Sequence, residues 1–384
     1  MYIADRMTQI PFSRIRKVFE EVLRREQNGE DIIHLDVGRP DFDTPQHIKD
    51  AARDALERGE VHYTSNYGLP ALRRAVARKL AADNGVEYDP EKELIITCGV
   101  TEAIFMSMIA HLNPGDEVLV PTPCFPAYHS CIRMAGGVPV DVPLDESDGF
   151  IPNVEKLRSA ITPRTRMIII NTPCNPTGVV YPRAALENIA RMAQEHDLIV
   201  VSDEVYEKMI YDGAEHVSIA SLPGMKPRTL TLNGFSKSYS MTGWRLGYIA
   251  APEEMTGALL RIRQYVTVCP TSFAQWGAVA ALEGPQDDLE MMVAEFARRR
   301  RLVCEAIEHM PNFFAVEPHG AFYVLVNISR MEKSPMDLAA HLLDEAKISV
   351  VPWGEKHIRI SYANSFEKLR TAMERMQSAV NSEQ

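Results

Sequence analysis

The amino-acid sequence predicts an α/β fold with a doubly wound, mostly parallel sheet and a smaller α+β unit beside it. Short apolar runs rich in β-branched residues recur between residues 94 and 250. Stretches with helical spacing of apolar residues separate most of these runs, for example at residues 101–112 and 183–196. Strands that alternate with helices are typical of a parallel sheet covered on both faces. The seven predicted strands are residues 94–97, 118–120, 138–142, 167–170, 198–201, 229–232 and 246–250.

The length of 384 residues suits one large α/β body with an appendage. We expect a large domain over residues 46–284 and a small C-terminal domain over residues 285–384, with a helical stretch at 275–310 leading from one to the other. Residues 1–45 are expected to form an N-terminal arm and part of the small domain. The other elements expected outside the large domain are a basic amphipathic helix at 12–28, strands at 321–326, 348–351 and 357–361, and a C-terminal helix.

Composition excludes several function classes. The net charge of −11 argues against nucleic acid and against an anionic membrane surface, because both require a basic face. No stretch approaches the roughly 18 apolar residues of a membrane span, and the first residues lack the apolar core of a signal peptide. Six cysteines are scattered without a C-x-x-C pair, so no metal site is predicted. We therefore expect a soluble, cytoplasmic protein.

Polar side chains with distinct chemistry follow three of the predicted strands. Asn175 comes after the strand at 167–170, Asp203 after 198–201, and Lys237 after 229–232. In an open α/β sheet, the carboxyl ends of the strands form the crevice where ligands bind. An amine that can form an imine, together with a carboxylate that can hold a ring nitrogen protonated, suits pyridoxal 5′-phosphate. The sequence therefore predicts a site for this cofactor.

Further residues complete this predicted site. Gly99, Val100 and Thr101 join a strand to a helix, whose N-terminus suits a phosphate. Ser236 and Arg245 add a hydroxyl and a forked cation. Tyr206 and Asn175 can bond the ring oxygen, and Phe125 can stack on the ring face. Arg359 lies in a strand-like run and can hold a substrate carboxylate.

Each of these residues also has a structural interpretation. Asp203 can cap a helix, Phe125 can be a core aromatic, and Asn175 lies in an N-P-T-G turn. For Arg359, a structural salt bridge and a substrate carboxylate are about equally favoured by the sequence. Neither G-x-G-x-x-G nor G-x-x-x-x-G-K-[ST] occurs, which weakens dinucleotide and nucleoside triphosphate binding.

Taken together, the motifs resemble those of the class I/II aminotransferases of pyridoxal-phosphate fold type I. The resemblance covers nearly the whole chain, and it is strongest to the bacterial aspartate or aromatic aminotransferase subgroup. The motifs that carry it are Gly38-Arg39-Pro40-Asp41-Phe42, Tyr63 to Gly68, Asn175-Pro176-Thr177-Gly178, Asp203-Glu204-Val205-Tyr206, Ser236-Lys237, Trp244-Arg245-Leu246-Gly247 and Arg359-Ile360-Ser361.

The resemblance implies a role for each residue. It gives Lys237 the Schiff base and the proton transfer, Asp203 the pyridine nitrogen, and Asn175 and Tyr206 the ring oxygen. It gives Arg359 the α-carboxylate, with Gly38 nearby and Asn175 touching the substrate. Around the phosphate it places Gly99, Val100, Thr101, Ser236 and Arg245, with Phe125 on the ring face. It also sends Tyr63 to the phosphate of a neighbouring subunit, which implies a homodimer with shared active sites.

The implied function is transfer of an amino group from an L-amino acid to a 2-oxo acid by a ping-pong mechanism. A C–S lyase or a cyclopropane-forming synthase of the same fold is the nearest alternative. A regulator that senses the cofactor is a third, but the 45 residues that end at Thr44-Pro45 leave no room for its DNA-binding domain. Two departures from the family pattern leave the amino donor open. The loop at 351–357 is short, and Arg39 stands where Glu or Gln is usual.

Overall fold

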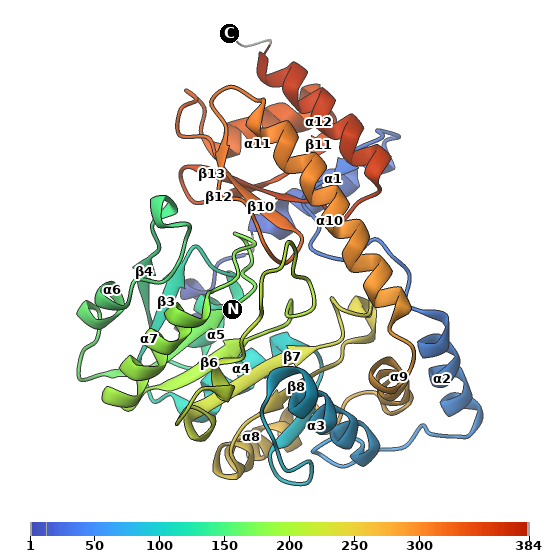
Figure 1. Cartoon of the computed structure of the whole chain (residues 1–384), viewed down its shortest axis with the longest axis vertical. Helices are drawn as coiled ribbons and strands as arrows, with labels where there is room; N and C mark the ends of the chain where they lie inside the picture. Colours follow the sequence, from blue (N-terminus) through green and yellow to red (C-terminus); the bar gives the residue numbers. More distant parts are fainter. Residues whose placement is uncertain (1, 13, 382–384) are drawn as a thin grey trace.

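A seven-stranded sheet forms the centre of the larger part of the molecule (Figure 1). The computed structural model describes residues 2–12 and 14–381. The strand order is β2-β8-β7-β6-β5-β3-β4, and only β8 runs antiparallel to its neighbours. The mostly parallel sheet predicted from the sequence is thereby confirmed. The strands are β2 (Leu94–Thr97), β3 (Glu117–Thr122), β4 (Val138–Pro143), β5 (Thr165–Asn171), β6 (Ile199–Asp203), β7 (Thr229–Gly234) and β8 (Gly247–Ala250).

Helices cover both faces of this sheet because its strands are apolar on both sides. In β5, Met167 and Ile169 pack in one core cluster, whereas Ile168 and Ile170 pack in another on the opposite face. This alternation follows from the two-residue period of a strand. The covering helices are α2 (Gln46–Glu57), α3 (Pro70–Asn84), α4 (Val100–His111), α5 (Ala127–Met134), α6 (Val154–Ser159), α7 (Arg183–Glu195), α8 (Glu253–Val266) and α9 (Ser272–Glu283).

The C-terminal part is built on a four-stranded antiparallel sheet in the order β12-β13-β10-β9 (Figure 1). Beside it, β1 pairs in parallel with β11, so the N-terminal segment contributes to this part of the molecule. Its elements are β1 (Ile33–His34), α10 (Asp287–Glu308), β9 (Phe314–Ala315), β10 (Tyr323–Asn327), α11 (Pro335–Glu345), β11 (Ile348–Ser349), β12 (Val351–Trp353), β13 (His357–Ser361) and α12 (Phe366–Asn381).

The structure corrects two predicted elements. The helical stretch at 275–310 is two helices, α9 and α10, because the chain breaks at Gly284 and Pro285. A proline disfavours helical backbone in the residue before it. The single strand expected at 348–351 is divided between β11 and β12, which belong to different sheets. The domain boundaries after residues 45 and 284 stay predictions.

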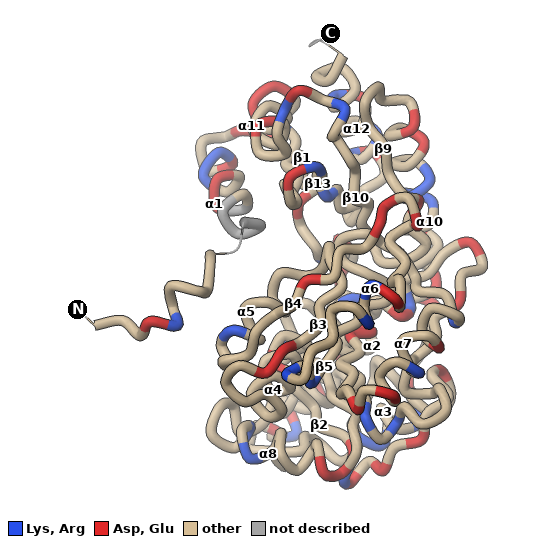
Figure 2. Tube along the Cα trace, turned by 90° about the vertical axis from the view of Figure 1, so that its left-hand side faces the viewer, with Lys and Arg blue, Asp and Glu red and all other residues tan. Residues whose placement is uncertain are grey.

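The N-terminal end lies on the outside of the molecule (Figure 2). A short 3-10 helix, η1 (Asp5–Gln9), precedes α1 (Arg14–Gln27). The helix expected at 12–28 is therefore present, but residue 13 and most side chains of its first turns lie outside the described residues, so its basic face stays a prediction. Tyr2, Ile3 and Phe12 are exposed. Among the described helices, none has the length and apolarity required to cross a membrane.

Candidate active site

A cavity of about 380 Å³ lies at the carboxyl ends of β5, β6 and β7 and reaches the C-terminal part. All the predicted site residues line it except Gly99 and Tyr63. Those that line it are Gly38, Val100, Thr101, Phe125, Asn175, Asp203, Tyr206, Ser236, Lys237, Arg245 and Arg359. The strand-end rule therefore predicted residues that line one cavity.

Lys237 lies half-buried in this cavity, just after β7. Its Nζ donates to the backbone carbonyl of Gly38 at 2.6 Å and lies 5.7 Å from the centroid of the Tyr206 ring. Burial, together with the positive charges of Arg359 and Arg245, lowers the pKa of Lys237 to about 8. A larger fraction of the amine is therefore neutral, and so nucleophilic, near neutral pH than for an ordinary lysine.

Asp203 ends β6 and is buried beside the cavity. Tyr128 donates its hydroxyl to Asp203 Oδ2 at 2.7 Å, and the Val205 N–H lies 3.3 Å from Oδ1. Burial raises the pKa of Asp203 to about 6. Within the described residues, Asp203 forms no ion pair with a lysine or arginine. This carboxylate therefore suits a ligand that carries a positive charge.

Arg359 is 2% exposed and comes from the middle of β13. Its Nη1 donates to Asn175 Oδ1 at 3.0 Å, and its Nη2 donates to the backbone carbonyl of Asp36 at 2.7 Å. The buried Nε has no hydrogen-bond partner. No carboxylate of residues 2–12 and 14–381 lies within ion-pair distance of Arg359. A buried cation without an anion favours an external carboxylate over the structural salt bridge.

Two tyrosines lie between Lys237 and Arg359. The hydroxyls of Tyr206 and Tyr323 are 2.8 Å apart, and the Arg359 guanidinium lies 4.4 Å from the centroid of the Tyr323 ring. A Cβ on Gly38 would lie 2.4 Å from the Tyr323 hydroxyl, so only glycine fits at this position. The N-terminal segment therefore closes one side of the cavity by backbone contact.

The start of α4 forms a site for an anion. Gly99 adopts φ +78° and ψ 169°, and it precedes the first helical residue. A Cβ on Gly99 would lie 2.5 Å from Arg245 Nη2, so the guanidinium packs directly on the glycine backbone. Thr101 and Ser236 contribute hydroxyls to the same end of the cavity. A helix N-terminus, two hydroxyls and a guanidinium fit a phosphate.

Tyr63 lies away from the cavity. Its side chain is 85% exposed, and it precedes α3 on the outer surface of the chain. The prediction for Tyr63 concerned the site of a neighbouring subunit, and it stays a prediction.

Three of the cavity residues that were not predicted carry polar groups on aromatic or amide side chains: Tyr128, Asn171 and Tyr323. Tyr128 follows Phe125 by three residues, Asn171 comes directly after the strand predicted at 167–170, and Tyr323 lies in a run that is apolar on both sides. The sequence position of Asn171 at a strand end could have indicated it. Tyr323 gave no such indication, because an aromatic residue in a strand is more often part of the core.

A family model described as aminotransferase class I and II matches residues 30–376. The chain belongs to this family. It is 45% identical to the aspartate aminotransferase of Pyrococcus abyssi, over 99% of this chain and 98% of that protein. It is 44% identical to aromatic-amino-acid aminotransferase 2 of Thermococcus litoralis, over 99% and 98% of the two chains. The solved structure of the Thermus thermophilus aspartate aminotransferase with maleate superposes with a TM-score of 0.94, at 40% identity over 99% of this chain and 100% of that one.

These findings make the chain a pyridoxal-phosphate-dependent aminotransferase, and the C–S lyase or synthase alternative is not favoured. The cavity fits the cofactor. It combines a lysine amine, a buried carboxylate that pairs with no cation of the described residues, and a helix N-terminus suited to an anion. Each matches one part of pyridoxal phosphate: the aldehyde, the ring nitrogen and the phosphate.

Proposed function

We propose that this aminotransferase uses Lys237 as its Schiff-base and proton-transfer residue and Arg359 as the receptor for the substrate α-carboxylate. The observation that carries the proposal is the arginine itself. Arg359 is buried and faces the cavity that holds Lys237, without a carboxylate partner among the described residues. An amino acid or a 2-oxo acid supplies the missing anion, and its Cα then lies on the same side of the cavity as Lys237.

The other residues divide between holding the cofactor and orienting it. Asp203 would face the ring nitrogen, Asn175 and Tyr206 the ring oxygen, and Phe125 the ring face. The phosphate would lie among Gly99, Val100, Thr101, Ser236 and Arg245. When bound, the cofactor supplies the carbonyl carbon that takes up the amino group and the ring that accepts the electrons released at Cα.

The chain's own groups perform the proton steps. Lys237 Nζ accepts the proton from the substrate Cα, and its lowered pKa keeps the amine ready to do so. Arg359 holds the carboxylate and fixes the direction of the Cα–H bond. Release of the 2-oxo acid leaves the amino group on the enzyme, and a second 2-oxo acid takes it up in the reverse half-reaction. The cycle is therefore ping-pong.

Chemical labelling tests the assignment of Lys237. Borohydride reduction of the purified protein should attach the cofactor covalently, and a peptide map should find it on Lys237. Lys237→Ala should still bind cofactor but lose turnover by several orders of magnitude. A label on another lysine refutes the assignment. Lys208→Ala is the control for replacing a lysine outside the site, because Lys208 pairs with Asp83 and does not line the cavity.

We also propose a homodimer in which Tyr63 serves the partner's site, and a cytoplasmic location. The exposed Tyr63 supports the first, since nothing in its own chain uses its hydroxyl among the described contacts. The six cysteines support the second: all are free thiols, as is usual in a reducing compartment. The division into domains at residues 45 and 284 belongs to the same proposal.

A further inference from the structure

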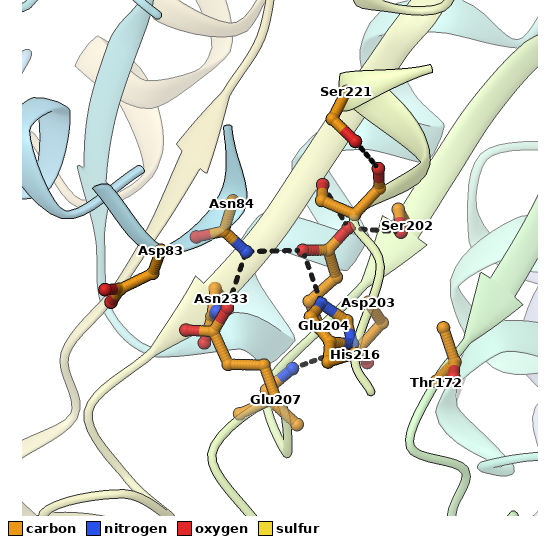
Figure 3. Close-up of polar contacts among 12 residues, drawn as sticks. Asp83, Asn84, Thr172, Ser202, Asp203, Glu204, Glu207, His216, Ser221 and Asn233 are labelled. Atoms are coloured by element: carbon orange, nitrogen blue, oxygen red, sulfur yellow. Dashed lines mark hydrogen bonds and ion pairs between the residues drawn. The ribbon is translucent and has the colours of Figure 1, made fainter. Parts of the chain in front are cut away.

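A buried cluster of charged and polar side chains lies beside the turn that begins at Asp203 (Figure 3). Its members come from α3, from the end of β6 and from the loop after it. We call it the Glu204 cluster, and it consists of Lys79, Asn84, Ser202, Glu204, Glu207, His216 and Ser218.

Glu204 is its centre and is 0% exposed. Ser202 Oγ and Ser218 Oγ each donate to Glu204 Oε1 at 2.8 Å. His216 Nε2 lies 3.2 Å from Oε2, and Asn84 Nδ2 lies 3.4 Å from the same oxygen. Both carboxylate oxygens therefore have two partners each, all supplied by the protein.

Glu207 is held from the opposite side by α3. Lys79 Nζ forms an ion pair with it, and Asn84 Nδ2 donates to Oε2 at 2.7 Å. Burial alone would raise the pKa of Glu207, but the charges of Lys79 and His216 outweigh it and hold that pKa well below its usual value. Burial likewise lowers the pKa of His216, but its bond to Glu204 outweighs this and the pKa is raised.

The charges of the cluster therefore balance internally. The ligand atoms of Glu204, Glu207 and His216 lie within 4.8 Å of one another, which is a spacing that a metal site can have. Here Lys79 supplies a positive charge beside Glu207, and the raised pKa of His216 favours a second one beside Glu204. We therefore interpret the cluster as a structural unit of the protein rather than as a metal centre.

Its position relative to the cavity is the decisive observation. Along residues 202–207, Asp203, Val205 and Tyr206 line the cavity, whereas Ser202, Glu204 and Glu207 belong to the cluster. The backbone between them is also fixed, because the Glu204 N–H donates to Leu232 of β7 at 2.9 Å. The same six residues thus carry cofactor-facing groups on one side and anchored carboxylates on the other.

We propose that the Glu204 cluster positions Asp203 and Tyr206 against the cofactor. The inference rests on the roles proposed above for those two residues. Desolvation offsets most of the attraction in a buried ion pair, so such pairs add little net stability. Any displacement of Glu204 or Glu207, however, leaves a buried charge unpaired. The cluster therefore resists small shifts of the turn that ordinary apolar packing would tolerate. Its members are positioning residues, because none of them lines the cavity.

Glu204→Gln is the test variant, and Glu117→Gln is its matched control. Glu117 is also a buried carboxylate of the same sheet, held by the Thr162 hydroxyl at 2.5 Å and by Arg164 Nη2 at 2.6 Å. It is the first residue of β3, at the amino ends of the parallel strands, whereas the cavity lies at their carboxyl ends. Both substitutions keep the side-chain shape and remove one buried negative charge. Only the first should disturb the Asp203–Tyr206 turn.

Three measurements on the holoenzyme separate the outcomes: the Kd for pyridoxal phosphate, the pH midpoint of its visible absorbance, and kcat with KM. For Glu204→Gln we expect a Kd about fivefold higher and a kcat about tenfold lower, because catalytic groups are sensitive to small displacements. KM for the amino donor should change less than about twofold, since Arg359 is untouched. The absorbance midpoint should shift downward by roughly half a pH unit, because a nearby negative charge is lost. Glu117→Gln should lower only Tm.

Ser218→Ala provides a milder variant that keeps every charge, in case Glu204→Gln does not fold. It should lower kcat by a smaller amount and leave the absorbance midpoint nearly unchanged, because no charge is lost. The proposal is overturned if Glu204→Gln or, failing its expression, Ser218→Ala changes Tm alone, as Glu117→Gln does. Failure of the underlying assignment is distinguishable: Asp203→Asn would then retain near wild-type kcat, whatever the cluster variants do.

Discussion

At the scale of single residues, Arg359 shows how burial and hydrogen bonding together indicate a function. Its guanidinium is buried, and its hydrogen-bond acceptors among the described residues are an amide oxygen and a backbone carbonyl. Both are neutral acceptors, so the positive charge is left for a ligand to balance. This is the feature that separates a binding arginine from a structural one.

Arg359→Lys should weaken amino-acid binding while leaving cofactor binding intact. Lysine keeps the charge but loses the planar fork that grips a carboxylate with two bonds. Charge-assisted bonds of this kind are worth about 1.5–3 kcal/mol, so KM should rise by about tenfold to a hundredfold. Stopped-flow measurement of the first half-reaction checks this. A collapse of pyridoxal phosphate affinity instead would mean that Arg359 is structural.

Arg39 is the residue that departs from the family pattern, and it lines the cavity next to Gly38. It is exposed and has no ion pair within the part of the chain that the structure describes. We expect Arg39→Gln to raise KM for donors with a second carboxylate, such as aspartate and glutamate, by about threefold to fivefold, the range of an exposed charge pair. KM for alanine should not change. Equal changes for both kinds of donor would contradict a role in side-chain recognition.

The lowered pKa of Lys237 predicts a pH dependence for cofactor uptake by the apoprotein. The charged form prevails below about pH 8 and the nucleophilic neutral form above it, so the rate should rise through this pH. Replacing Arg359 by methionine removes one of the positive charges and should move the midpoint upward. Rapid-mixing absorbance measurements on apoprotein test both expectations. A midpoint near 10 in the unmodified chain would show that the amine is not perturbed.

At the scale of elements, the junction between β2 and α4 places the anion site. Its backbone at Gly99 lies in a region of φ and ψ that is open essentially only to glycine. An L-residue there costs about 1–3 kcal/mol, and its Cβ would also meet Arg245. The turn therefore depends on Gly99 both for its backbone conformation and for its close contact with the Arg245 guanidinium.

Gly99→Ala should weaken pyridoxal phosphate binding by at least about tenfold, because it displaces Arg245 as well as the helix start. Gly115→Ala is a suitable control, since Gly115 also has a positive φ, of +87°, but its Cβ would meet nothing within 4 Å. The control should lower Tm and leave the cofactor Kd unchanged. Fluorescence titration of the two apoproteins gives the comparison, and similar Kd values would refute the predicted role of the junction.

The strands were predicted well because a run of β-branched residues bounded by turn residues indicates a strand from the local sequence alone. Residues 94–97 and 357–361 agree with β2 and β13 at both ends. That the predicted strand-end residues would share one cavity could be inferred for a related reason, since topology places strand ends together. The Glu204 cluster was not predictable. Lys79 and Glu207 are 128 positions apart, and only tertiary packing brings them together.

At the scale of the whole molecule, the exposed Tyr63 predicts the assembly. If it serves the partner's site, a mixed dimer of Lys237→Ala and Tyr63→Phe chains contains one site with every residue intact. The chain that keeps Lys237 then receives Tyr63 from its partner. The mixed dimer should show about half the activity of the unmodified dimer, well above either parent.

Native gels must first show that mixed dimers form, because a lack of restored activity is informative only if these dimers are present. If these dimers reach only half the activity of Tyr63→Phe, then Tyr63 acts within its own chain. An additional Lys208→Ala change in one parent gives a control for mixing itself and should have no effect.

The strand order has a consequence for biosynthesis. The first strand of the sheet to leave the ribosome, β2, has β8 as its neighbour, and β8 is the last strand of this sheet to be made. The edge of β2 therefore stays unpaired until about residue 250 has emerged, and the hairpin between β7 and β8 delivers Lys237 and Arg245 at the same moment. If Lys237 holds the cofactor as proposed, the complete site forms only when the sheet is complete, and cofactor loading then reports on finished folding rather than assisting its early stages.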